Sequence, residues 1–417
     1  MSAATPGATP GTTEDPTMSA SAAALGEERR GIGYALRKLA EGELGSLRVL
    51  IVLAIVWVIF AALNDRFLTA VNLTNLTLQI AAVGTISVGV VLVLLLGEID
   101  LSVGAVSGLA AGVTAVLNVK HGWNPYLAIV AGLLVGTAIG VFQGSIATRL
   151  GIPSFVVTLA GLLAWTGALL KVLGETGTVN LSDPAITNLA GTFLAEPLGW
   201  LVGIAAAAAI VGTALMNRRR RQAAGLEVEP IGALALRTGA ASLAILAAVA
   251  VVNADRGVPV GVLILIGLVV VFNALITRTT YGRHVLAVGG NAEAARRAGI
   301  RVTFVRTSVF ALCSTLAAFG GILAASRLLA VNQSSGASDL LLLAIAGPVI
   351  AGVSLFGGRG SVWAALLGAL VIGSISNGMD LLGLSSPDKF MVTGGVLLAA
   401  VSLDALSRQR RRAHGRL

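Results

Sequence analysis

The sequence predicts an all-α, polytopic membrane protein with about twelve transmembrane helices and both termini in the cytoplasm. Hydrophobic residues make up 56% of the 417 residues, charged residues make up only 12%, and long apolar runs recur along almost the whole chain. Soluble domains carry about 25% charged residues, and a helix needs about 20 predominantly apolar residues to cross a bilayer. We therefore expect a multi-pass protein of the plasma membrane.

The apolar runs divide the chain into a tail, a membrane domain and a second tail. Residues 1–46 are rich in Ala, Thr, Pro and Gly and become basic, which predicts a disordered cytoplasmic tail. The membrane domain covers 47–406, and a basic cytoplasmic tail, 407–417, follows it. The predicted spans are 48–63, 76–96, 101–117, 125–147, 153–173, 197–216, 232–252, 258–277, 306–328, 338–356, 361–382 and 388–406.

The positions of the basic residues orient these spans. With both ends inside, most of the 29 Lys and Arg residues fall in cytoplasmic segments, as the positive-inside rule requires. The exceptions are Arg66, Lys120, Lys171, Arg256, Arg327 and Lys389. Because the net charge of +9 is distributed among loops and does not form one basic face, the composition argues against a nucleic-acid partner. A charged cytoplasmic linker, 217–231, contains Arg218 to Arg221, which we expect to anchor the topology and to contact anionic membrane lipid.

Glycines at a spacing of four residues predict close helix packing. They form two rows, Gly104, Gly108 and Gly112, then Gly132, Gly136, Gly140 and Gly144. Small residues at this spacing let helix backbones approach closely within a membrane. We expect a rigid scaffold.

Residues 97–104, Gly-Glu-Ile-Asp-Leu-Ser-Val-Gly, join two of the apolar runs and place two acids at or near the membrane. One interpretation is local capping, in which Gly97 ends one helix and Asp100 or Ser102 caps the next. The other is that this hairpin packs at the centre of a transport pathway, through Gly97, Asp100, Leu101, Ser102 and Gly104.

The loop 278–305 is expected to contain a short cytoplasmic helix. Asn291 is placed to cap it, Glu293 lies in its first turn, Arg296 and Arg297 lie in its last turn, and Gly299 is placed to end it. A helix this short needs a surface to dock on. That surface is either the inner face of this protein with the lipid headgroups, or a separate subunit.

Polar groups in the last third of the chain suit a hydroxylated solute. Gly347-Pro348 predicts either a kinked span or two half-helices over 338–356. Asn332 and Gln333 precede this run on the expected outer side, and Asn377 and Asp380 lie in the next span. These side chains can contact such a polyhydroxylated solute, or they can hydrogen-bond neighbouring helices.

Three motifs together resemble one family. The stretch 97–104, the loop stretch 281–300, and the pair 357–361 and 376–383 are similar to signatures of the permease subunit of bacterial ABC sugar importers, in the branch with ribose, arabinose and xylose permeases. The resemblance covers roughly 70–406. The extra segment 217–257 makes the chain look most like the longer xylose permease. Glu98 departs from the pattern, because members more often have a neutral residue there.

The resemblance implies ATP-driven, binding-protein-dependent import of a monosaccharide, a pentose and foremost xylose. It implies three partners: ATPase subunits, an extracytoplasmic sugar-binding protein and a second permease copy. The loop 278–305 would couple to the ATPase, with Tyr281, Gly282, Arg283 and Gly289 beside the helix that begins after Asn291. ATP and Mg²⁺ would belong to the ATPase, since this sequence has no G-x-x-x-x-G-K-[ST] loop.

The residues leave one alternative class open. An ion-coupled secondary transporter of a small polar solute would need buried acids, for which Glu98, Asp100 and Asp380 are the candidates. An enzyme is not expected, because no H-E-x-x-H or Ser/His arrangement occurs. No catalytic, cofactor or metal residues are predicted, since Cys313 is the single cysteine and the three histidines are scattered.

Overall fold

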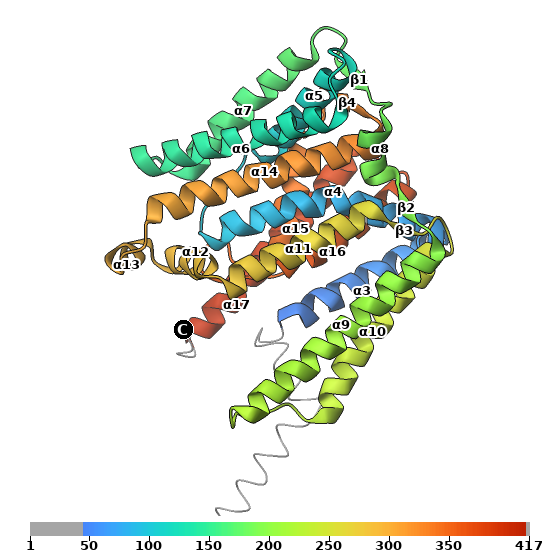
Figure 1. The fold of residues 1–417 in the computed structure, drawn as a ribbon, viewed down its shortest axis with the longest axis vertical. Coiled ribbons are helices and arrows are strands. Elements are labelled where there is room, and N and C mark those ends of the chain that lie inside the picture. The colour runs from blue at the N-terminus through green and yellow to red at the C-terminus, as the bar shows by residue number, and fades with distance from the viewer. Residues whose placement is uncertain (1–44, 414–417) are drawn as a thin grey trace, which may run out of the picture.

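The computed structural model describes residues 45–413, and in this range the chain is mainly helical (Figure 1). The predictions for 1–44 and 414–417 lie outside the described residues. The helices are α3 (Gly45–Leu63), α4 (Ala70–Leu95), α5 (Val103–Val119), α6 (Pro125–Leu150), α7 (Ser154–Leu173), α8 (Pro184–Gly191), α9 (Glu196–Ala223), α10 (Ile231–Asn253), α11 (Val260–Arg278), α12 (Thr280–Gly290), α13 (Ala292–Arg297), α14 (Val302–Leu328), α15 (Ser338–Ile350), α16 (Trp363–Leu381) and α17 (Ser386–Ala413).

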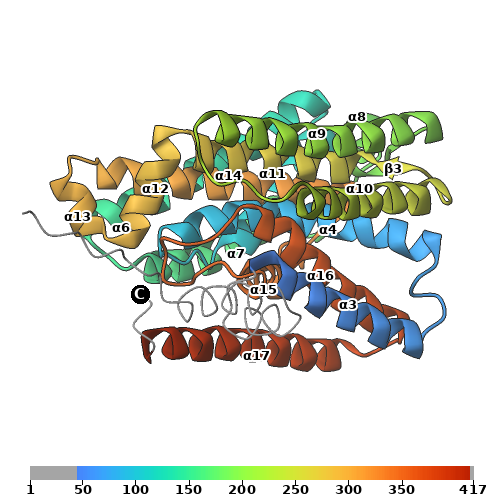
Figure 2. The same ribbon diagram turned by 90° about the horizontal axis from the view of Figure 1, so that it is seen from below.

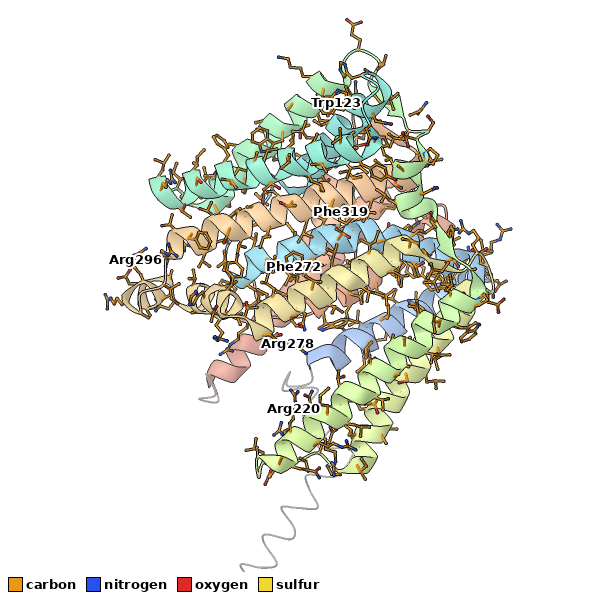
Figure 3. The ribbon with its side chains drawn as sticks, viewed as in Figure 1. Trp123, Arg220, Phe272, Arg278, Arg296 and Phe319 are labelled. Carbon is orange, nitrogen blue, oxygen red and sulfur yellow. The ribbon has the colours of Figure 1, made fainter. Side chains whose placement is uncertain are left out.

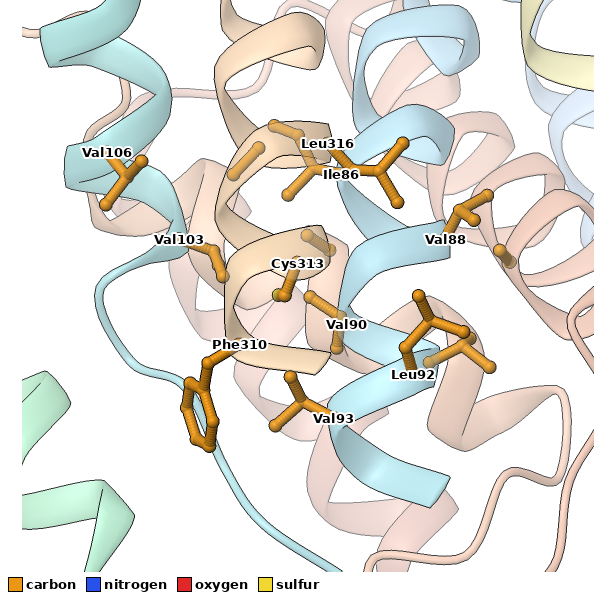
Figure 4. Packing of buried hydrophobic residues seen from close by; sticks show 14 of the residues in the cluster. Ile86, Val88, Val90, Leu92, Val93, Val103, Val106, Phe310, Cys313 and Leu316 are labelled. Carbon is orange, nitrogen blue, oxygen red and sulfur yellow. The ribbon is translucent and has the colours of Figure 1, made fainter. Parts of the chain in front are cut away.

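Helix α4 forms the centre of the bundle. Of the residues in its most apolar stretch, 89% are buried inside the protein, and the helix packs against α11, α14, α15 and α16. A helix that is apolar on all sides belongs in the interior. Figure 4 shows part of the resulting core, in which Val90 and Val93 of α4 face Cys313 and Phe310 of α14. Cys313 is fully buried.

Each of the twelve predicted spans contains a helix, but the helices differ in length. Among the described residues, eight helices are long and apolar enough to cross a membrane: α4, α6, α7, α9, α10, α11, α14 and α16. Helices α3, α5 and α15 offer shorter apolar stretches. The prediction of two half-helices over 338–356 is wrong, because α15 is one short helix with Pro348 in its last turn, and residues 351–362 form a non-helical loop.

The glycine rows pack as predicted. A Cβ on Gly136 would lie 2.7 Å from the Ser314 carbonyl oxygen, and one on Gly144 would lie 3.0 Å from the Thr307 Cα, so this face of α6 lies against α14. In the other row, a Cβ on Gly104 would lie 2.7 Å from the Gly336 carbonyl oxygen. The backbones approach too closely for any larger side chain.

Two small β-pairs and α8 close one end of the bundle. Strand β1 (Thr178–Asn180) pairs antiparallel with β4 (Ala330–Asn332), and β2 (Phe193–Leu194) pairs with β3 (Val258–Pro259). Helix α8 begins with Asp183, whose Oδ1 accepts a hydrogen bond from the Ala185 amide at 3.0 Å. We name this the outer end, and the opposite end, with the Arg-rich tip of α9 and the α12–α13 segment, the inner end, after the orientation that the positive-inside rule predicts (Figure 1).

The side chains follow the same division. Figure 3 places Arg220, Arg278 and Arg296 at the inner end and Trp123 near the outer end. Viewed from below, α9 and α17 lie along opposite edges of the molecule (Figure 2). Helix α9 continues to Ala223, so Arg218 to Arg221 are helical and the non-helical linker is shorter than the predicted 217–231. Helix α17 likewise continues through 407–413.

Candidate functional site

The segment 97–102, which we call the junction, lies between the inner end of α4 and the start of α5. Gly97 follows the C-cap of α4 with φ +74°, which confirms that it ends the helix. The amide of Leu101 donates to Thr158 Oγ1 of α7 at 3.1 Å, and Ser102 contacts Gln143 of α6. Gln143 precedes the inner end of α6 by two turns, so α5 begins about 10 Å inside the bundle.

Asp100 anchors the junction from within the protein. Its side chain is 4% exposed, and its Oδ1 accepts from the amide of Ser102 at 2.8 Å and from the Ser102 hydroxyl at 2.7 Å. Its other oxygen has no hydrogen-bond partner within the described structure. Ser102 is the N-cap residue of α5, but its side chain makes no capping bond, and Asp100 binds the amide that precedes the helix. The capping interpretation therefore holds for Gly97 and fails for the Ser102 side chain.

A glutamine connects this carboxylate to an indole. The Ser102 hydroxyl has one hydrogen, which it donates to Asp100, yet Gln143 Oε1 lies 3.0 Å away. At the same time Gln143 Nε2 and Trp165 Nε1 are buried with no hydrogen-bond partner among residues 45–413. Both nitrogens lie around Gly161, close to the position a Cβ would take there. We assign the amide turned by 180°, so that its NH₂ donates to Ser102 and its oxygen faces the indole side.

Glu98 has a structural role that the sequence pattern did not assign to it. Its Oε2 accepts from the Ser154 hydroxyl of α7 at 2.6 Å, and its Oε1 pairs with Arg306 of α14 at 3.2 Å. The Glu98 side chain is only 17% exposed. Sequence reasoning missed Ser154 and Arg306, because both partners lie far from Glu98 along the chain.

The inner face also presents α12, which the sequence did not predict as a helix. The Thr279 hydroxyl caps it by accepting from the Gly282 amide at 3.1 Å, and the Tyr281 hydroxyl hydrogen-bonds Ser308 at 2.8 Å. Burial raises the pKa of Tyr281, although the bond to Ser308 acts in the opposite direction. Arg283 is exposed on this helix.

Gly289 brings α12 against α4. A Cβ on Gly289 would overlap the Leu95 carbonyl oxygen, which already accepts from the Gly358 amide at 2.9 Å. Gly357 in turn packs on Gly97. The inner loops therefore touch the end of α4 where the junction begins.

Helix α13 has the predicted local form. Asn291 Oδ1 accepts from the Ala294 amide at 2.9 Å, Glu293 pairs with Arg296 at 2.6 Å and with Arg297 at 3.3 Å, and Gly299 has φ +83°. The three charged side chains are all more than half exposed. Beside the helix lies a hollow of about 560 Å³, lined by Arg149, Arg296, Arg301 and Phe304 among others. The helix thus presents a basic surface at the inner end.

A pocket of about 370 Å³ opens in the outer half, between α4, α5, α14 and the segment 330–340. Its polar lining consists of Gln79, Ser107, Arg327, Asn332, Ser334 and Ser335. Its floor is the point where Gly336, with φ +75°, packs against the backbone of Gly104 and Gly108. The N-terminal ends of α5 and α15 therefore meet inside the bundle, and neither helix crosses it alone.

Of the four polar residues predicted for a pathway, only Asn332 lines this pocket. Gln333 packs towards Gly177 of the outer loop. Asn377 is buried and exchanges two hydrogen bonds with Asn72 of α4, at 2.8 and 3.0 Å. Asp380 pairs with Lys389 near the outer end. Sequence reasoning missed Gln79, Ser107 and Arg327, because nothing in the sequences of their helices indicates that these side chains come together around one pocket.

Long apolar helices, an outer polar pocket and a basic inner face are features typical of membrane transport proteins. The family described as branched-chain amino acid transport system / permease component matches residues 72–401, and the chain belongs to this family. It is a multi-pass protein of the cell membrane.

Curated relatives match most of the chain. The xylose transport system permease protein XylH of Escherichia coli K12 is 38% identical over 347 residues, which is 83% of this chain and 88% of the relative. XylH of Haemophilus influenzae is 35% identical over 363 residues, 87% of this chain and 96% of that protein. The ribose import permease RbsC of Bacillus subtilis is 31% identical over 364 residues, 87% and 94% of the two chains. No solved structure matches the chain.

Proposed function

We propose that this chain is the permease subunit of an ATP-driven, binding-protein-dependent importer of a pentose, foremost xylose. Its similarity to proteins named as xylose transport permeases supports the substrate. In this proposal a second permease copy completes the pathway, an extracytoplasmic binding protein delivers the sugar, and separate ATPase subunits hydrolyse ATP with Mg²⁺. The chain itself gates the passage and carries out no covalent chemistry.

The observation that carries the coupling proposal is the contact of α12 with the end of α4. A force applied by an ATPase on α13 reaches α12, and α12 touches Leu95 through Gly289. Because Leu95 lies only two residues before the junction, displacement of α12 moves the segment from which α5 begins. Glu98 gives a second connection, through Arg306 of α14.

The outer pocket is the proposed entry site for the sugar. Its amide, hydroxyl and guanidinium groups offer both donors and acceptors, which a polyhydroxylated ring needs to replace its water. The close contact of Gly336 with Gly104 and Gly108 forms the barrier beneath it. Import then requires the ends of α5 and α15 to separate.

Uptake of labelled xylose by the reconstituted transporter tests the function. With both partner proteins present, we expect uptake that stops on ATP depletion and survives a protonophore. Uptake that needs no ATPase and is abolished by a protonophore would support the ion-coupled alternative.

The coupling surface has its own test. E293A/R297A removes an exposed acid–base pair of α13, and we expect ATP hydrolysis to continue while uptake falls at least about tenfold, with unchanged membrane insertion. D255A/R256A removes an acid–base pair at the outer end, whose nitrogen and oxygen atoms lie 2.9 Å apart, and should leave coupling intact. Equal uptake by the two variants would refute a coupling role for α13.

A further inference from the structure

The α9–α10 hairpin is attached to the bundle chiefly at its outer end. There Val249 and Val252 of α10 pack with Val258 and Trp200, and Arg256 donates to Asn75 at the start of α4. Towards the inner end most residues of both helices are exposed. The inner tip of this hairpin therefore extends towards the inner membrane surface without other described helices packed around it.

A pocket of about 430 Å³ lies at this tip. Three arginines line it, Arg218 and Arg221 from α9 and Arg237 from α10, together with Asn217, Glu227 and Glu229. The Leu226 amide donates to the Arg221 carbonyl at 3.0 Å, which closes the turn between the helices.

Glu229 holds two of these arginines in place. Arg218 Nη1 donates to the Glu229 carbonyl oxygen, and Arg237 pairs with the Glu229 carboxylate at 3.2 Å. The linker therefore fixes two guanidinium groups around the pocket before any ligand arrives.

The three arginines of the pocket keep N–H groups with which they can bind an anion. Each guanidinium carries five N–H donors, and the described contacts occupy only a few of the fifteen or so that three arginines offer. Arg221 has no acidic partner among residues 45–413. Several guanidinium groups converging on one space favour a phosphate group, which they bind through paired, charge-assisted hydrogen bonds.

The flanks of the pocket favour a lipid over a soluble phosphate. Leu215 of α9 and Leu236 and Leu243 of α10 are exposed apolar side chains that lie level with the pocket or nearer the outer end. A phosphate held at the tip would place its acyl chains along these flanks. We propose that the tip of the α9–α10 hairpin is a binding site for the headgroup of an anionic phospholipid, built from Arg218, Arg221 and Arg237. Of the four consecutive arginines at the end of α9, only Arg218 and Arg221 take part.

This selectivity within one arginine run makes the proposal testable. The purified full-length chain in phosphatidylcholine nanodiscs is titrated with phosphatidylglycerol, and bound lipid is counted by native mass spectrometry. We expect R218Q/R221Q to weaken binding about tenfold, and R219Q/R220Q, which removes the same charge from two exposed arginines outside the pocket, to change it less than about twofold. An equal loss in both variants would overturn the proposal, because diffuse charge alone would then explain binding.

Two controls separate the remaining outcomes. R237Q removes the arginine that α10 contributes, and we expect it to weaken lipid binding without changing the thermal unfolding profile. If lipid binding falls only together with the unfolding temperature, a direct contact between Arg237 and the lipid is contradicted. Millimolar inorganic phosphate should leave lipid binding unchanged. Complete displacement by phosphate would contradict a lipid site and identify a site for a soluble anion.

Discussion

At the scale of single residues, the junction depends on one buried carboxylate and the polar groups that face it. A buried charged group is costly unless hydrogen bonds satisfy it. Asp100 obtains two from Ser102, whose position is in turn set by Gln143. Gln143 has room only because residue 161 is glycine.

Gly161→Ala tests this arrangement. The added Cβ would overlap the end of the Gln143 side-chain amide and lie 2.9 Å from Trp165 Nε1. We expect a loss of about 1–3 kcal/mol in stability, the usual range for overpacking, and a large fall in uptake. Thermal unfolding in detergent and sugar uptake measure the two effects.

Gly167→Ala is the matched control. Gly167 lies on the same helix, and a Cβ there meets nothing within 4 Å. It should be neutral or slightly stabilising, since Ala is favoured over Gly in a helix. Equal behaviour of the two variants would contradict the assigned role of Gln143.

At the scale of elements, α15 shows how a proline is accommodated near the end of a short helix. Pro348 has no amide hydrogen, so the carbonyl of Ala344 loses its helical donor. The Ser87 hydroxyl of α4 donates to this carbonyl at 3.0 Å. One hydrogen bond between helices therefore replaces one within a helix.

A double-mutant cycle measures this replacement. Ser87→Ala should destabilise the protein by about 1–2 kcal/mol, the cost of an unsatisfied buried carbonyl. In a Pro348→Ala background the new amide at 348 supplies the donor, and the effect of Ser87→Ala should shrink by about half or more. The unfolding free energies of the four proteins give the coupling, and strict additivity would show that Ser87 does not serve this carbonyl.

The sequence predicted what depends on local pattern. The apolar runs located twelve of the helices, Asn291 and Gly299 marked the ends of α13, and the glycine spacing identified the close-packed faces of α5 and α6. The missed elements are α8, α12, the two β-pairs and the non-helical segment 333–337 before α15. Each packs on partners distant in sequence: the Ala190 amide of α8 donates to Ser326, Gly289 of α12 lies against Leu95, and Asn332 pairs with Thr178. For the same reason Asp100 was predicted as a site residue, whereas Arg327 and Arg306 were not.

At the scale of the whole molecule, the inner loops and the interior meet at one place. The Leu95 carbonyl contacts both Gly289 of α12 and Gly358 of the loop after α15. Motion applied at the inner face therefore reaches the start of α5 and the end of α15 together. The N-terminal ends of the same two helices meet beneath the outer pocket, where Gly336 packs on Gly104 and Gly108.

Gly289→Ala tests this transmission. Its Cβ would overlap the Leu95 oxygen and force α12 away from α4, so we expect ATP hydrolysis by the assembled transporter to lose its link to uptake. Gly290→Ala, the adjacent control, meets nothing within 4 Å and should retain coupling. The ratio of sugar transported to ATP hydrolysed is the readout, and an unchanged ratio in Gly289→Ala would exclude this route.

The burial of Cys313 has a practical consequence for observing such motion. The only thiol of the chain is sealed between α14 and α4, where Gly89 lies against its backbone. Maleimide dyes and nitroxide spin labels will therefore react with a cysteine introduced at an exposed position such as Arg283 and leave the native one untouched. Fluorescence or electron spin resonance can then follow the inner face during turnover in an otherwise wild-type protein.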